Sequence, residues 1–259
     1  IDTGSVFMEL CRSSSIQKNV SILEKGQRNQ EQPLAWSAYT LNPDGPKPEK
    51  EKYGELQPNT ADRIEKASHE AFSEIIKLAK AGNAEKAVTM LNSVKILCSH
   101  REGPTGVRKL NQLIRKKHEL VDPLAPGSVI MVNRNDHRVT GLSNGDIGII
   151  MHNGEACFAE NRAGQSKAKF RFVKPSQIPS YEDAFATTVH KSQGSEYHTV
   201  IVVVPPVGSP LLRRELLYTA ITRARKHLVL IASEDAITSA VMNPINRASG
   251  LAARVRGEV

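Results

Sequence analysis

The spacing of apolar residues predicts several helices and one strand in the first half of the chain. Apolar residues recur three and four positions apart, as on one face of a helix, within residues 61–79, 84–91 and 106–119. The short apolar run Val94–Cys98 predicts a buried strand. Residues 41–60 are rich in proline, glycine and charge and have few apolar anchors, so they predict a loop.

The pattern changes at Pro126. Over residues 126–175 the apolar runs are short and are separated by Asn-Gly and Gly turns, which predicts a small antiparallel barrel inserted in the chain. After Pro179 strands and helices alternate. We expect strands at 185–189, 199–204 and 227–232, a helix at 210–225, and a last helix that starts near Glu234. The outer parts of the chain therefore predict an α/β layered fold with an all-β insert.

The amino-acid composition favours one class of binding partner. With 35 basic and 27 acidic residues the net charge is +8, which favours a polyanionic partner such as nucleic acid or a nucleotide. The three cysteines lie far apart without CxxC spacing, so a cysteine zinc site is not indicated and the thiols are expected to be reduced, as in a cytoplasmic protein. No run of residues is long and apolar enough to predict a membrane span.

Polar residues cluster directly after the predicted strand at 185–189. Ligands of open parallel sheets bind at the carboxyl ends of strands, and Thr188, His190 and Lys191 lie there. Hydroxyl, imidazole and backbone N–H groups can hold phosphate oxygens. Gly194 allows close backbone approach, and Glu196 could accept a hydrogen bond from a ribose hydroxyl. The alternative is a polar crossover with a capped helical turn.

Two arginines, Arg223 and Arg225, are predicted at the carboxyl end of the helix at 210–225. Cations in that position complement the helix dipole, which accounts well for one of them. In the alternative, one arginine points at a γ-phosphate and stabilises the charge that develops during phosphoryl transfer.

These residues carry a family resemblance. The stretches "TTVHKSQGSEY" and "LLYTAITRARKHL" resemble motifs V and VI of RecD-type superfamily-one DNA helicases, in order and spacing. The stretches "ILCSHREGPTGVRKLN" and "NRNDHRVTGLSNGDIGII" are similar to a RecD-type signature and to the opening of an SH3-like barrel in these helicases. The opening "DTGSVFMEL" resembles the segment after motif III, and "NRASGLAARV" resembles the tail of exodeoxyribonuclease V alpha subunits.

The resemblance implies a P-loop NTPase-type, RecA-like second motor domain with an inserted SH3-like β-barrel. Residues 1–125 would form the first part of the RecA-like domain, 126–176 the barrel, and 177–259 the remainder with motifs V and VI. The sequence contains no GxxxxGK[ST] loop and no Asp-Glu pair of the Walker B type. We therefore expect a piece of a longer subunit whose preceding domain supplies both, and an isolated chain that is inactive.

The resemblance also assigns roles around ATP. Arg223 would be the arginine finger of motif VI. Arg28, in "ILEKGQRNQE", would be a second γ-phosphate contact, although Gln27 stands where the family usually has an aromatic residue. Gly194, Glu196 and Arg225 would bind the nucleotide. ATP and Mg²⁺ are the implied cofactors, with the Mg²⁺ ligands outside this chain.

The implied partners are DNA and two subunits. Thr188, His190 and Lys191 would contact single-stranded DNA, along which the helicase would move 5′ to 3′ during unwinding for recombinational repair. The beta and gamma subunits of exodeoxyribonuclease V would complete the assembly. Two alternatives remain open: a nucleic-acid-binding or docking module without motor activity, and a domain of a stand-alone RecD-like helicase.

Overall fold

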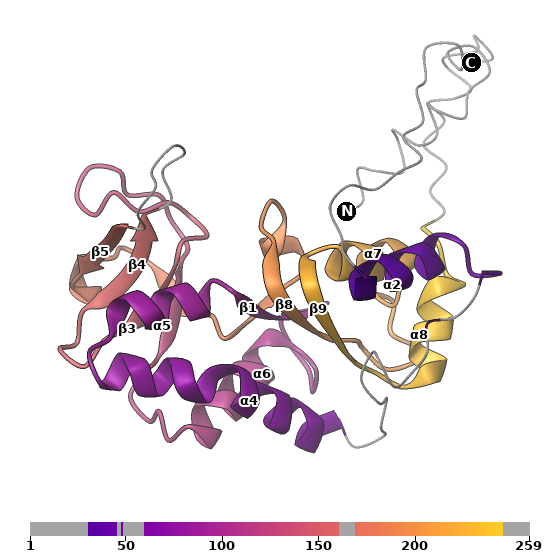
Figure 1. Cartoon of the computed structure of the whole chain (residues 1–259), viewed down its shortest axis with the longest axis horizontal. Helices are drawn as coiled ribbons and strands as arrows, with labels where there is room; N and C mark the ends of the chain where they lie inside the picture. The colour runs from indigo at the N-terminus through magenta and orange to yellow at the C-terminus, as the bar shows by residue number, and fades with distance from the viewer. Residues whose placement is uncertain (1–30, 46–47, 49–59, 161–168, 246–259) are drawn as a thin grey trace, which may run out of the picture.

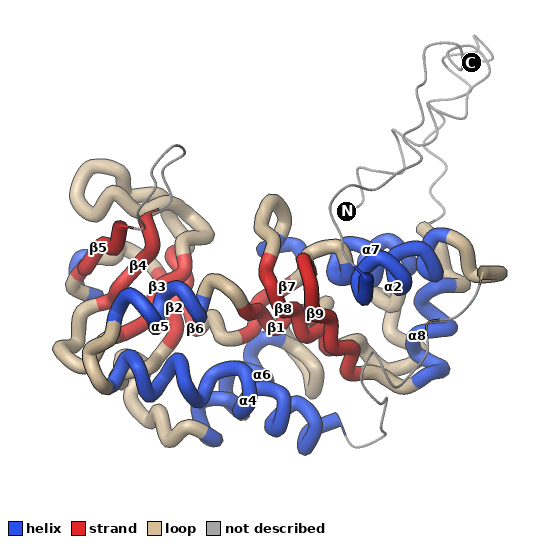
Figure 2. The backbone as a smooth tube through the Cα atoms, viewed as in Figure 1, coloured by secondary structure: helices blue, strands red, loops and turns tan. Residues whose placement is uncertain are grey.

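The computed structural model describes residues 31–45, 48, 60–160 and 169–245. They form two β-sheets, one at the left end and one in the middle of an elongated body in the view of Figures 1 and 2, with helices packed around them. The helix α4 (Thr60–Lys80) runs below both sheets in the view of Figure 1.

The first sheet is parallel. Its strands are β1 (Val94–Cys98), β7 (Ala186–Thr188), β8 (Tyr197–Val203) and β9 (Ala224–Ile231), in the order β7-β1-β8-β9. Side chains on β8 alternate between two cores: Ile201 and Val203 pack on one side of the sheet, Val200 and Val202 on the other. A strand that is buried on both faces reads as a continuous apolar run, which explains the VIVVV sequence.

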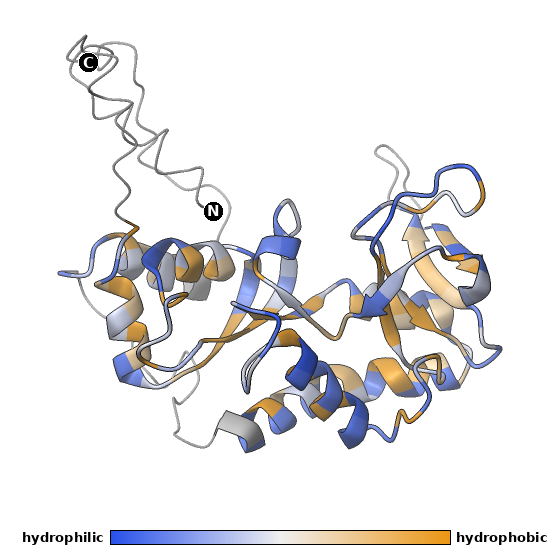
Figure 3. Ribbon diagram, turned by 180° about the vertical axis from the view of Figure 1, so that it is seen from behind, coloured by the Kyte–Doolittle hydropathy of each residue, from blue (hydrophilic) through white to orange (hydrophobic). Residues whose placement is uncertain are grey.

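Helices cover both faces of this sheet (Figure 1). On one side α4, α5 (Ala84–Leu91) and α6 (Val107–Lys117) contribute to the first core. On the other side α2 (Glu31–Leu41), α7 (Arg214–Ile221) and α8 (Glu234–Val241) form the second core. Coloured by hydropathy, the strands and the inward sides of the helices carry the apolar residues (Figure 3). The described residues contain no helix with the length and apolar character needed to cross a membrane.

The second sheet is antiparallel. Its strands are β2 (Val129–Val132), β3 (Ile147–Ile150), β4 (Ala156–Glu160), β5 (Lys169–Val173) and β6 (Tyr181–Asp183), in the order β5-β4-β3-β2-β6. The sheet extends beyond the predicted end of the insert at 176, because β6 pairs with β2. Since the described residues show no pairing between β5 and β6, closure into an SH3-like barrel stays a prediction.

The predicted helices and strands agree best with the structure where the apolar residues follow a clear pattern. The helix at 84–91 and the strand Val94–Cys98 have the predicted bounds, and Asn83 caps α5 by accepting a hydrogen bond from the backbone N–H of Lys86. The predicted helix at 210–225 is too long. It ends at Ile221, and Arg225 lies on β9 because Ala224 already pairs with Tyr197 of β8. Helix α2 was not predicted.

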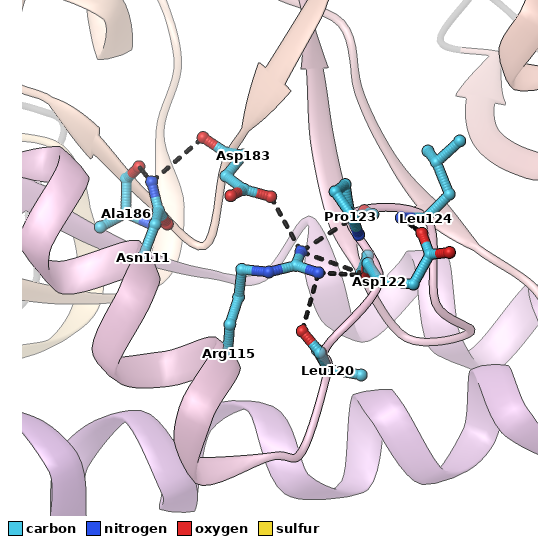
Figure 4. A network of polar contacts seen from close by, with 9 residues as sticks. Asn111, Arg115, Leu120, Asp122, Pro123, Leu124, Asp183 and Ala186 are labelled. Carbon is cyan, nitrogen blue, oxygen red and sulfur yellow. Dashed lines mark hydrogen bonds and ion pairs between the residues drawn. The ribbon is translucent and has the colours of Figure 1, made fainter.

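The two sheets are joined by the short crossing from β6 to β7, which is held by a network of polar contacts (Figure 4). Asn111 of α6 is buried, donates to the carbonyl oxygens of Asp183 and Ala186 at 3.1 and 3.2 Å, and accepts from the backbone N–H of Ala186 at 2.9 Å. Arg115, one turn further along α6, donates from Nη1 to the Asp183 carboxylate at 2.9 Å. The strand β7, and the residues that follow it, are thereby fixed relative to the antiparallel sheet.

Lys95 of β1 is a third anchor of this crossing. Its side chain is fully buried and its ammonium donates to the carbonyl oxygen of Ala184 at 2.6 Å. Burial lowers the pKa of Lys95 to about 7, because a charge without water is costly. The parallel sheet therefore contains a buried lysine whose pKa lies close to physiological pH.

Candidate nucleotide and nucleic-acid site

The turn after β7 presents the first group of predicted site residues. Thr188 is the last residue of β7, and His190–Ser192 forms the short 3-10 helix η3. The Thr188 hydroxyl oxygen accepts from the backbone N–H of Lys191 at 3.3 Å, and the buried Ser192 hydroxyl donates to the carbonyl oxygen of Val189 at 2.7 Å. These bonds fix the turn while His190 stays exposed.

Lys191 is tied to the antiparallel sheet. Its ammonium donates to a carboxylate oxygen of Glu182 on β6 and, at 3.3 Å, to the side-chain oxygen of Asn133. The other carboxylate oxygen of Glu182 accepts from Nη2 of Arg101 at 2.8 Å. The carboxyl ends of β1 and β7 therefore meet at one acidic residue on the neighbouring sheet.

The second group of predicted residues lies at the opposite edge of the parallel sheet, at the amino ends of β8 and β9. Arg225 donates from Nε to the Glu196 carboxylate at 3.1 Å. The carbonyl oxygen of Arg223 accepts from the backbone N–H of Tyr197 at 2.8 Å. The loop before β8, which contains Ser195 and Glu196, thus contacts Arg223 and Arg225 at the start of β9, 28 and 29 residues further along the chain.

The guanidinium of Arg223 is held by carbonyl oxygens. Nε donates to Thr219 at 3.1 Å and Nη1 donates to Ser195 at 3.3 Å, and the side chain is partly exposed. No ion pair joins Arg223 to a carboxylate in the part of the chain that the structure describes. A guanidinium has five N–H donors, so this one is oriented by the protein and keeps donors for an anion.

Its positive charge reaches the neighbouring strand. Burial raises the pKa of Tyr197, and a hydrogen bond with Ser195 and the charge of Arg223 act in the opposite direction.

Gly194 has φ +86°, a conformation that favours glycine, and a Cβ there would meet nothing within 4 Å. The backbone before Glu196 is therefore open to a ligand.

A cavity lies beside this turn. It has a volume of about 340 Å³ and is lined by Gly194, Glu196 and Lys191 on one side and by Gly145 and Asp146 of the antiparallel sheet's connecting loop on the other. Such a volume is at the lower end of ligand pockets in proteins. Arg223 does not line this cavity but donates to the carbonyl oxygen of Ser195, which does. The Lys191 ammonium and the open backbone at Gly194 are compatible with an anion such as a phosphate.

The predicted residues thus fall into two groups. Thr188, His190 and Lys191 lie at or directly after the carboxyl end of β7, whereas Glu196, Arg223 and Arg225 lie at the amino ends of β8 and β9. The cavity joins the groups, because Lys191, Gly194 and Glu196 all line it. Arg28 lies outside the described residues. The described residues contain no group of three or more His, Cys, Asp or Glu side chains that could hold a metal ion.

Sequence reasoning missed one participant, Glu182. Nothing in the local sequence distinguishes it from a solvated carboxylate, because its two partners lie 81 and 9 residues away. Arg101 belongs to the stretch "ILCSHREGPTGVRKLN", which resembles a RecD-type signature, but the resemblance assigns this arginine no role.

Comparison with known proteins finds helicase relatives. Residues 183–231 match the family model described as UvrD-like helicase C-terminal domain. The RecBCD enzyme subunit RecD of Haemophilus influenzae is 36% identical over 65% of this chain, which covers 26% of that protein. The RecBCD enzyme subunit RecD of Mycobacterium tuberculosis (strain H37Rv) is 33% identical over 69% of the chain and 31% of that protein.

The chain is similar to the RecD subunits of RecBCD enzymes over about two thirds of its own length. The chain spans about a quarter to a third of the length of these curated relatives. It is also 28% identical, over 56% of its length and 21% of the relative, to the ATP-dependent RecD2 DNA helicase of Deinococcus radiodurans. Among solved structures, a Bacteroides Pif1 helicase in complex with ADP-AlF3 and ssDNA is similar over 78% of this chain and 54% of that one, with 17% identity and a TM-score of 0.38.

Proposed function

We propose that this RecD-type domain is the second motor domain of an ATP-dependent 5′-to-3′ DNA helicase, the alpha subunit of an exodeoxyribonuclease V, which unwinds DNA for recombinational repair. One observation carries the proposal. Glu196, Arg223 and Arg225 meet at the amino ends of β8 and β9, with the Arg223 guanidinium oriented by two carbonyl oxygens and free of a carboxylate partner among the described residues.

Each residue has a distinct task in this proposal. Arg223 places positive charge where negative charge develops on the γ-phosphate, which is how arginine fingers accelerate phosphoryl transfer. Glu196 accepts from the ribose, and Arg225 holds the Glu196 carboxylate in place. Gly194 keeps the backbone open beside them. ATP supplies the phosphoryl group whose transfer to water drives movement.

The remaining parts of the ATP site would come from elsewhere. The phosphate-binding lysine and the Mg²⁺ ligands belong, in this proposal, to a preceding RecA-like domain, and Arg28 adds a second contact to the γ-phosphate. The relatives named as RecBCD enzyme subunits support partner subunits, which in this proposal are the beta and gamma subunits, and the complex acts in the cytoplasm.

On the nucleic-acid side, Thr188, His190 and Lys191 would contact the backbone of single-stranded DNA. These residues lie at the carboxyl end of β7, at the other edge of the sheet from Arg223. Residues 193–195, between the η3 turn and Glu196, connect the two groups along the chain. In this proposal a change beside Glu196 and Arg223 is transmitted to the residues that contact DNA through this one short segment.

The 259-residue chain tests this proposal directly. We expect it to bind single-stranded DNA with an affinity that falls as salt rises, since phosphate contacts release counterions. We also expect no DNA-stimulated ATP hydrolysis, because half of the ATP site is missing. Fluorescence anisotropy and a coupled ATPase assay measure the two. Turnover by this chain alone, or salt-independent binding, contradicts the proposal.

A further inference from the structure

One carboxylate serves two cations at the carboxyl ends of β1 and β7. Glu182 accepts from Lys191 through one oxygen and from Arg101 through the other, the second contact being 2.8 Å long. The Glu182 side chain is 22% exposed, that of Lys191 34% and that of Arg101 61%. The cationic head groups therefore lie on either side of one small acidic group at the surface.

The neighbouring acidic residue does not neutralise this cluster. Asp183 follows Glu182 in the chain, but its carboxylate pairs with Arg115 on α6, on the other side of the crossing (Figure 4). Two positive charges thus share one negative charge. The excess positive charge lies next to Thr188 and the exposed His190, the residues that the proposed function assigns to nucleic acid.

Lys191 and Arg101 hold the Glu182 carboxylate in a way that would also suit a phosphate group. Lys191 and Arg101 bind two different oxygens of one carboxylate, and two oxygens of a phosphodiester present a similar pair of acceptors. Asn133, which also accepts from Lys191 at 3.3 Å, and the backbone N–H bond of Lys191 to Thr188 keep the ammonium in place.

We propose that Arg101 and Lys191 form a binding site for one phosphodiester of single-stranded DNA, and that the carboxylate of Glu182 occupies this site until the strand displaces it. This inference rests on the proposed function. Glu182 acts as an internal competitor that weakens DNA binding at this site and links release of the strand to re-formation of the contact between the η3 turn and the antiparallel sheet.

If Glu182 competes with DNA for the two cations, removing its negative charge should increase the affinity for DNA. Glu182→Gln keeps the shape and leaves an oxygen for Lys191, but it binds the two cations less strongly than a carboxylate does. We expect the variant to bind an oligothymidylate about three to ten times more tightly, and its affinity to fall more steeply with salt, because more counterions are released on binding.

The matched control removes the same charge elsewhere. Glu74→Gln breaks an exposed pair with Lys77 on α4 that involves neither Arg101 nor Lys191, and we expect it to change affinity by less than about twofold, since exposed pairs contribute little. Arg101→Gln and Lys191→Gln should each weaken binding and lower the salt slope. In the Arg101→Gln/Lys191→Gln background, Glu182→Gln should have no larger effect than Glu74→Gln.

The experiment is fluorescence anisotropy of a labelled oligothymidylate with the full 259-residue chain, across a series of salt concentrations, with thermal melts to check folding. Wild-type binding together with tighter binding by Glu182→Gln supports the inference. Wild-type binding with equal or weaker binding by Glu182→Gln overturns the inference alone. Absence of wild-type binding overturns the proposed nucleic-acid function and the inference with it. If Glu182→Gln does not fold, unchanged binding by Arg101→Gln and Lys191→Gln overturns the inference.

Discussion

Arg225 donates a hydrogen bond from Nε to the carboxylate of Glu196 at 3.1 Å, although 29 residues separate them in the chain. The pair spans the first residues of two adjacent parallel strands, β8 and β9. A stretch predicted as the end of a helix thus becomes a strand that supports the carboxylate assigned to the nucleotide.

The first prediction separates the positioning role of Arg225 from its contribution to stability. The Arg225 side chain is 63% exposed, so Arg225→Gln should change the free energy of unfolding by less than about 1 kcal/mol. In a polypeptide that also carries the preceding domain, it should raise the KM for ATP several-fold and leave DNA affinity unchanged. Urea unfolding and steady-state kinetics measure these quantities, and an unchanged KM would show that Glu196 needs no such support.

Asn111 provides a prediction about the junction of the sheets. Asn111→Ala leaves the backbone groups of Asp183 and Ala186 buried without these partners, which should lower the free energy of unfolding by about 2–4 kcal/mol. The neighbouring residue Gln112 is exposed on the same helix, so Gln112→Ala should cost less than about 0.5 kcal/mol. Equal effects of the two substitutions in denaturant titrations would contradict the anchoring role of Asn111.

Lys95 predicts a dependence of stability on pH. The folded protein holds this lysine with a pKa of about 7, whereas the unfolded chain has the ordinary value of 10.5, so between these values the unfolded state binds the extra proton. Stability should therefore rise with pH across this window, by up to about 1.4 kcal/mol per pH unit, and the penalty should be complete below about pH 7.

Lys95→Met isolates that contribution. The difference in free energy of unfolding between wild type and Lys95→Met should move in favour of wild type as pH rises from 7 to 10. Other groups that ionise at high pH, such as Cys98, whose pKa burial raises to about 12, are present in both proteins and cancel. A difference that does not vary with pH would mean that Lys95 is charged in the folded protein.

Much of the fold follows from local sequence. The helix at 84–91 and the strand at 94–98 were predictable because apolar spacing and a capping asparagine act over a few residues. The end of the helix at Ile221 and the start of a strand at Ala224 were not predictable from local sequence, because Ala224 pairs with Tyr197 of β8, 27 residues away in the chain. Motif residues such as Thr188 and Arg223 could be named from the sequence, but their separation to opposite edges of the sheet depends on the crossing between β7 and β8.

The contacts that join the two sheets were beyond sequence reasoning for the same reason. Asn111 meets Asp183 and Ala186 across 72 and 75 residues, and Lys95 meets Ala184 across 89. No local pattern distinguishes such residues from ordinary polar positions of a helix or strand. A lysine inside an apolar run was the one available signal, because full burial of lysine is rare.

The central claim is that the guanidinium of Arg223 completes an ATP site shared with another domain. The most direct measurement is the kcat for ATP hydrolysis of Arg223→Lys in the polypeptide that carries both motor domains. Arg213→Lys is the control, since Arg213 donates to the side-chain oxygen of Asn243 at 2.6 Å and has no assigned role at the nucleotide. We predict that Arg223→Lys lowers kcat by about a thousandfold while affinity for single-stranded DNA stays unchanged. A kcat for Arg223→Lys within about threefold of that for Arg213→Lys would contradict the account.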